Sequence, residues 1–196
     1  EVDEANETPN VEATVASSCE AGALAARHLL DLGHRDIGLI FPEVEENDRA
    51  RDRLTGAIQE LANAGVTVPD IWRSDAPYSI SDAKLATARF LNAPTLPTAL
   101  LCGNDVIAQG ALYAASQFRL NVPQDLSIMG IGDFKGAADI EPALTTVRIP
   151  AKRIGRETGR VIAAAIVSAE TTPSGLHCTP NLIIRSSTGV VPNPTK

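Results

Sequence analysis

Polar and charged residues follow each of three apolar runs, and their types suit the binding of a small molecule. The runs lie at residues 37–41, 99–102 and 126–131. In an open parallel sheet the carboxyl ends of such strands meet at one edge, where these folds hold ligands. The groups after the three runs are therefore predicted to line one crevice: Asn47, Arg49 and Arg53 after the first, Asn104 and Asp105 after the second, Gly132 and Asp133 after the third.

The first group supplies guanidinium side chains. Arg53 lies one helical turn beyond Arg49, so both can point over the crevice from one side of a helix. A guanidinium fork suits a carboxylate, a phosphate or vicinal hydroxyls. Tyr78 precedes another predicted helix and can stack on a sugar ring or a nucleobase, or else pack under its loop.

The second and third groups have two interpretations each. Asn104 can cap the helix that follows it, whose N-terminus favours the carboxylate of Asp105, or both can bind ligand hydroxyls. Asp133 can cap a short turn, or accept hydrogen bonds from a ligand at the mouth of the crevice. From these residues alone, both alternatives stay open.

No catalytic, metal or cofactor motif emerges, so the sequence favours a binding protein over an enzyme. There is no P-loop, no Gly-x-Ser-x-Gly and no dinucleotide fingerprint. The three histidines and three cysteines have no metal-ligand spacing, and the cysteines are expected to be free buried thiols. His34 follows the helix-ending Gly33 and is expected to interact with terminal carbonyls of that helix.

Composition excludes several classes of protein. The 196 residues are 44% hydrophobic and 21% charged, which is typical of a globular domain with a packed core. No apolar stretch approaches the roughly 18 residues of a membrane helix, and no signal peptide is recognisable, so we expect a cytoplasmic protein. The net charge of −7 argues against this segment gripping nucleic-acid phosphates itself.

The elements that must position these residues alternate along the chain. Strands are predicted at 11–15, 37–41, 71–73, 99–102, 126–131, 144–149 and 181–185, and helices at 18–32, 48–64, 79–92, 104–118 and 152–168. A repeating strand–helix order with short connections predicts an α/β fold, with a parallel sheet flanked by helices on both faces.

Five strings in the sequence together resemble the LacI/GalR family of transcriptional regulators. They are AARHLLDLGHRDI (25–37), RLTG (53–56), PTALLCGNDVIAQGA (97–111), VPQDLSIMG (122–130) and PALTTV (142–147). The resemblance implies a periplasmic-binding-protein-like fold of type I, mainly its C-terminal lobe. It divides the chain into a lead-in and crossover strand (1–15), the C-terminal lobe (16–147), a segment of the N-terminal lobe (148–178), and a return strand and tail (179–196).

The resemblance also implies roles for individual residues. Arg53 matches the arginine that binds effector, Asn104 the first member of an effector-binding Asn-Asp pair, and Tyr78 a stacking aromatic. The family commonly has two Asp residues after the strand at 126–131, the first of which binds ligand. Here that position is Gly132 and only Asp133 remains, and Ala16-Ser17 replaces a usual Asp-Asn pair, which argues against a standard pyranose site.

The function implied is that of an effector-binding and dimerisation core of a transcriptional regulator. Its expected partners are a sugar or related metabolite, a second copy of the chain in a homodimer, and operator DNA held by a head domain absent from this sequence. The alternative is a periplasmic solute-binding protein of a transporter, which shares the fold. No cofactor or membrane partner is expected.

Overall fold

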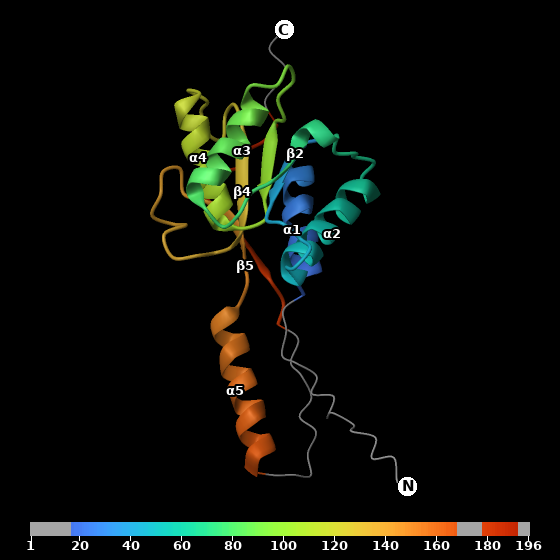
Figure 1. Cartoon of the computed structure of the whole chain (residues 1–196), viewed down its shortest axis with the longest axis vertical. Coiled ribbons are helices and arrows are strands. Elements are labelled where there is room, and N and C mark those ends of the chain that lie inside the picture. The colour runs from blue at the N-terminus through green and yellow to red at the C-terminus, as the bar shows by residue number, and fades with distance from the viewer. Residues whose placement is uncertain (1–16, 168–177, 192–196) are drawn as a thin grey trace. The chain divides into compact units, whose positions relative to one another are not determined.

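Figure 1 shows the computed structural model, which describes residues 17–167 and 178–191; helices and strands alternate along the chain except that β5 follows β4 directly. The helices are α1 (Ser18–Asp31), α2 (Asp48–Asn63), α3 (Ile80–Leu91), α4 (Asp105–Gln117) and α5 (Ala151–Val167), with one 3-10 turn at Asp70–Trp72. The strands are β1 (Ile37–Phe41), β2 (Arg73–Asp75), β3 (Ala99–Cys102), β4 (Ser127–Gly132), β5 (Thr145–Arg148) and β6 (Asn181–Ile183).

The six strands form one sheet in the order β2-β1-β3-β4-β5-β6. The first five are parallel, and β6 runs antiparallel beside β5. The parallel strands therefore all end at one edge, called the carboxyl edge below, and begin at the opposite, amino edge. Loops after β1, β2, β3 and β4 converge on the carboxyl edge.

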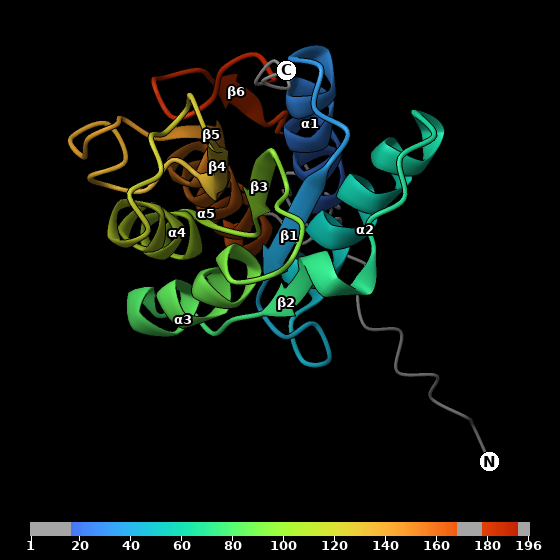
Figure 2. The same ribbon diagram turned by 90° about the horizontal axis from the view of Figure 1, so that it is seen from above.

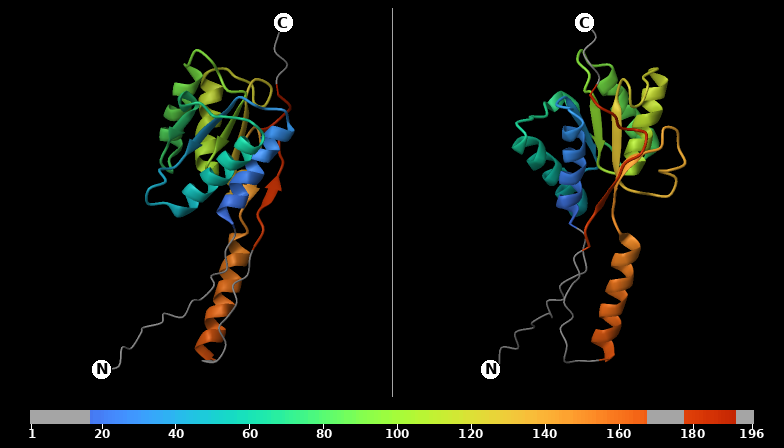
Figure 3. Two further views of the ribbon diagram at one scale, coloured as in Figure 1. Left: turned by 90° about the vertical axis from the view of Figure 1, so that its right-hand side faces the viewer. Right: turned by 180° about the vertical axis from the view of Figure 1, so that it is seen from behind.

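Two aliphatic cores hold the helices on the two faces of the sheet. Figure 2 and the right-hand view of Figure 3 show α1 and α2 on one face and α3 and α4 on the other. Leu29, Leu39 and Leu101 belong to the first core, and Leu100, Ile107 and Ile128 to the second. Because β1 and β3 are buried along their whole length, their sequences are continuous apolar runs rather than alternating ones.

Two glycines bring α1 and α2 into backbone contact. A Cβ atom at Gly22 would collide with the carbonyl group of Arg53, and one at Gly56 with the carbonyl group of Cys19. Only glycine permits this approach from both sides. The crossing fixes the position of the α2 turn that carries Arg53.

The predicted parallel sheet with helices on both faces is confirmed, with differences in strand bounds and in the direction of β6. The strand predicted at 71–73 begins two residues later, as β2, because Asp70–Trp72 forms a 3-10 turn in which the buried Trp72 donates through Nε1 to the Thr95 carbonyl. The strand predicted at 126–131 starts and ends one residue later, and β6 is antiparallel. The strand predicted at 11–15 lies outside the described residues.

The chain divides into two compact units. One comprises residues 18–149 and 181–196 and contains the sheet with α1 to α4; the other comprises residues 1–17 and 150–180 and contains α5. The assignment of residues 148–178 to an N-terminal lobe stays a prediction. Within the described ranges, no helix is long and apolar enough to cross a membrane.

Candidate functional site

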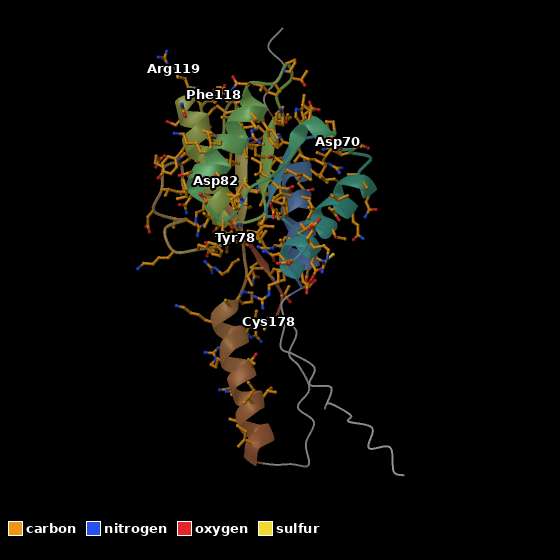
Figure 4. The ribbon with its side chains drawn as sticks, in the orientation of Figure 1. Asp70, Tyr78, Asp82, Phe118, Arg119 and Cys178 are labelled. Carbon is orange, nitrogen blue, oxygen red and sulfur yellow. The ribbon has the colours of Figure 1, made fainter. Side chains whose placement is uncertain are left out.

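Arg53, Tyr78 and Asn47 come together at the carboxyl edge. Arg53 Nη2 donates to Tyr78 Oη at 3.3 Å, and Asn47 Nδ2 lies 3.4 Å from the same oxygen. Asn47 also caps α2, because its Oδ1 accepts from the Ala50 N–H at 3.0 Å. Tyr78 is 50% exposed, and Figure 4 places it at the end of the sheet unit opposite Phe118. These hydrogen bonds connect the segment that follows β1 to the loop that follows its neighbour β2.

Arg53 is the buried member of the arginine group. Its exposed fraction is 8%, and its Nε donates to the backbone carbonyl of Arg49 at 3.0 Å. It forms no salt bridge with any described residue. Arg49 is exposed, and Arg51 is exposed and paired with Asp48, as expected for a solvated face.

Asn104 caps α4 but leaves half of its amide unsatisfied. Its Oδ1 accepts from the Ile107 N–H at 3.0 Å, so the capping interpretation holds. The residue is 0% exposed, and its Nδ2 has no hydrogen-bond partner among the described residues. Buried donors without a partner are rare in native proteins and mark a place where water or ligand completes the site.

Asp105 is also buried, and both of its oxygens accept hydrogen bonds from the protein. Thr146 Oγ1 donates to Oδ1 at 2.6 Å, and the Phe134 N–H donates to Oδ2 at 2.7 Å. Burial raises the pKa of Asp105 above the usual range, although both hydrogen bonds oppose the rise. Asp105 therefore connects α4 to β5 and to the loop after β4.

Asp133 lies between two arginines. Arg148 Nε and Arg185 Nη2 each donate to one of its oxygens at 2.6 Å. Burial disfavours the charged carboxylate, but the hydrogen bonds and charges of Arg185 and Arg148 outweigh burial and lower the pKa of Asp133. Arg148 ends β5 and Arg185 follows β6, so one carboxylate joins the loop after β4 to two strands.

Gly132 has a backbone conformation that an aspartate would not adopt readily. Its φ is +140°, and a Cβ atom there would collide with the ring of Phe134. Phe134 is 42% exposed. The departure from the family pattern is therefore accompanied by an aromatic ring beside the position where the usual carboxylate would start.

Four residues of this arrangement were not predicted from the sequence: Thr146, Arg148, Arg185 and Phe134. The order Gly132-Asp133-Phe134 could have indicated that the Phe134 ring packs against Gly132, since a glycine has no side chain to occupy that space. Arg185 is 52 residues from Asp133 in the sequence, and only the strand pairing brings them together. No local pattern predicts that contact.

His28 and His34 lie at the amino edge, away from this arrangement. His34 is 0% exposed, and its ring nitrogens contact Thr98 Oγ1 at 2.9 Å, Ser127 Oγ at 3.1 Å and the Gly189 carbonyl at 3.0 Å. The expected interaction with a carbonyl at the end of α1 is made by the backbone N–H of His34, which donates to the Leu29 carbonyl at 3.1 Å, whereas the ring has the three other partners. The described residues contain no His/Cys/Asp/Glu group suited to a metal ion.

The cysteines are unpaired. Cys102 and Cys178 are buried, as expected, whereas Cys19 is only half-buried. Burial raises the pKa of the Cys102 thiol, so this group stays protonated and unreactive.

Comparisons with known proteins agree with the fold. The profile of the periplasmic binding protein-like domain matches residues 26–188. The HTH-type transcriptional repressor PurR of Escherichia coli O139:H28 is 34% identical over 176 residues, which are 90% of this chain and 51% of that protein. The chain thus spans about half the length of the curated relatives it matches.

Solved structures give the same result. A LacI family transcriptional regulator from Mycobacterium smegmatis has a TM-score of 0.81 and 29% identity, over 93% of this chain and 68% of its own. A LacI family regulator from Enterococcus faecium with bound ribose has a TM-score of 0.81 and 25% identity, over 91% of this chain and 66% of its own. The resemblance predicted from the five sequence strings is confirmed over the matched region.

Proposed function

We propose that this chain, which belongs to the family of periplasmic binding protein-like domains, is the effector-binding and dimerisation core of a LacI-type transcriptional regulator. Its relatives are transcriptional regulators rather than enzymes or transport proteins, which favours this function over a transporter's solute-binding protein. The ribose-bound regulator supports a sugar or related metabolite as the class of effector.

The buried guanidinium of Arg53, hydrogen-bonded to Tyr78, is the observation that carries this proposal. A charged group in that position is costly unless a partner meets it. Asn104, with its unsatisfied Nδ2, follows the adjacent strand and adds a second polar group that needs a partner. Effector binding at the carboxyl edge satisfies both.

The residues proposed to form the binding site differ in whether their polar atoms are free to contact effector. Arg53, Tyr78, Asn47 and Asn104 would contact effector directly, with Arg49 at the exposed rim. The oxygens of Asp105 and Asp133 are already engaged by protein donors. These two aspartates would instead hold the loop of Gly132 and Phe134 in place.

Regulation would follow from differential affinity. An effector that binds a closed arrangement of two lobes more tightly than an open one shifts the population towards the closed arrangement, and only by that difference in affinity. Residues 148–178 would belong to the N-terminal lobe in this scheme. A DNA-binding head elsewhere in the protein would respond to the shift.

The remaining partners follow from this assignment. The full-length protein would be a homodimer that binds operator DNA in the cytoplasm through its head domain. It would have no catalytic residue and no cofactor. The negative charge of this chain agrees with DNA contacts being made by another part of the protein.

The experiment is to recover the complete natural reading frame and test the full-length protein for specific DNA binding by gel shift and for mass by light scattering. We expect a helix-turn-helix head, a dimer, and DNA binding that changes with effector. A reading frame without a DNA-binding domain would exclude the regulator. Arg53→Ala should abolish the effector response while leaving DNA binding intact, and unchanged effector affinity would exclude its assigned role.

A further inference from the structure

We propose that the effector carries an oxyanion, a phosphate ester or a carboxylate, which binds the guanidinium of Arg53. This inference rests on the proposed effector-binding function and specifies its ligand class. It follows from which charges at the carboxyl edge are compensated within the chain and which are not.

Arg53 and Arg185 differ in their partners. Arg185, with a side chain 15% exposed, is neutralised by Asp133 at 2.6 Å. Arg53 is 8% exposed, and its hydrogen-bond partners among the described residues are a tyrosine hydroxyl and a backbone carbonyl, both uncharged. A buried guanidinium without an acid is unfavourable, so a complementary anion gains more here than at a solvated arginine.

Acidic residues near the start of α2 do not compensate Arg53. All six of these residues are exposed: Glu43, Glu45, Glu46, Asp48, Asp52 and Asp75. Asp48 forms its salt bridge with Arg51 rather than with Arg53. Solvated carboxylates are screened by water and salt, and they exert only a weak field on a buried group. The guanidinium charge is therefore left for a ligand.

The other polar groups at this edge also favour a ligand rich in acceptors. Asn104 offers a free N–H donor, because its oxygen is used in capping. A polyol needs acceptors for its hydroxyl protons, yet the carboxylates of Asp105 and Asp133 already accept from protein donors. Phosphate and carboxylate oxygens only accept, which matches what the described residues leave available.

The loop after β4 reinforces this preference. Gly132 carries no carboxylate, and the half-exposed ring of Phe134 occupies the adjoining space. An acidic side chain at that point would repel an anion. A glycine and an aromatic ring instead present a neutral, apolar surface to the uncharged part of the ligand.

The test compares three compounds with one carbon skeleton, D-ribose, D-ribonate and D-ribose 5-phosphate, with inorganic phosphate as the minimal probe. Binding to the full-length protein is measured by calorimetry and by thermal shift at constant ionic strength. We expect at least one sugar anion to bind about tenfold or more tightly than ribose, which corresponds to one additional charge-assisted contact. The phosphate and carboxylate arms identify which oxyanion the site prefers.

Arg53→Met and Arg53→Lys are the test variants, and Arg51→Met is the matched control. Arg51 lies on the same helix, carries the same charge, and is exposed. We expect Arg53→Met to lose the anion preference, Arg53→Lys to retain part of it, and Arg51→Met to behave as wild type. Midpoints without ligand show whether each variant folds.

Three outcomes would overturn the proposal. Ribose could bind as tightly as both sugar anions, or Arg53→Met could bind the anions as tightly as wild type does. The third outcome is that no oxyanion raises the thermal midpoint of wild type more than that of Arg53→Met. Operator binding, measured on the same samples, separates this from failure of the proposed function. If the protein binds the anion through Arg53 but binds no DNA, the proposed ligand class stands and the proposed function as a regulator is excluded.

Discussion

The two edges of the sheet differ in how completely their buried polar groups are satisfied. At the amino edge, both ring nitrogens of His34 meet partners, and His28 Nε2 meets Thr188 Oγ1 at 3.0 Å. At the carboxyl edge, Asn104 retains an unpartnered donor and Arg53 an uncompensated charge. Satisfied buried networks stabilise one fold, whereas unsatisfied groups reduce stability and persist where they bind something. The amino edge is therefore assigned to stability and the carboxyl edge to ligand binding.

The largest expected effect tests the amino edge. His34→Ala removes contacts to Thr98, Ser127 and Gly189 and leaves a cavity, so we expect the free energy of unfolding to fall by about 3 kcal/mol. Urea denaturation of the full-length protein measures it. Arg35→Ala, at an exposed neighbour, is the control. A loss as small as that of the control would mean that the network stabilises nothing.

A smaller effect is expected where a carboxyl-edge group is compensated. Asp133→Asn keeps the shape but removes the charge that neutralises Arg185 and Arg148, with an expected loss of about 2 kcal/mol at neutral pH. Because its pKa is lowered in the folded state, this contribution is present above the ordinary Asp pKa and disappears as the pH falls through the folded value. Asp139→Asn, at an exposed position of the same loop, should change neither the unfolding free energy at neutral pH nor its dependence on pH.

Gly132→Ala tests the backbone of the same loop. The positive φ and the ring of Phe134 both oppose a Cβ atom, and we expect a loss of about 1.5 kcal/mol in unfolding free energy. Adding Phe134→Ala should restore the part of the lost unfolding free energy that comes from the collision with the ring. The part that comes from the positive φ should remain lost. If the two changes are simply additive in denaturation experiments, the ring does not restrict this position.

Arg53→Met sharpens the contrast between compensated and uncompensated arginines. We expect the unfolding free energy without ligand to change by less than about 1 kcal/mol, because the charge removed had no acidic partner. Arg185→Met should lose about 2 kcal/mol, because it leaves Asp133 with one arginine. Equal losses in the two variants would contradict the distinction on which the ligand class depends.

The smallest effect is on pH dependence at the amino edge. Burial lowers the pKa of both His28 and His34, so the folded state keeps them neutral when the unfolded chain takes up protons below about pH 6.5. Stability should therefore fall as the pH is lowered through that value and be flat above about pH 7. Denaturation midpoints across this range measure it, and His28→Gln should reduce the slope. A slope of opposite sign would mean that the histidines are charged in the fold.

Apolar runs and capping residues predicted most of the sheet unit. The runs at 37–41 and 99–102 match β1 and β3 residue for residue, because strands buried on both faces need continuous apolar sequence. Asn104 caps the helix that follows it, which is one of the two interpretations that its type allowed. The strand predicted at 71–73 begins two residues later because the buried side chain of Trp72 determines the local turn, and its contact with Thr95 is non-local.

The sequence by itself determined which residues reach the carboxyl edge, since parallel strands with short connections allow only that placement of Arg53, Tyr78, Asn104 and Asp133. Only the tertiary structure decided which of their charges are compensated. Asp133 meets Arg185 through the pairing of β6 with β5, and Asp105, which follows β3, meets Thr146 of β5 across the intervening β4. Local sequence determines the types of charge and their edge, whereas neutralisation depends on contacts between residues 41 and 52 positions apart in the chain.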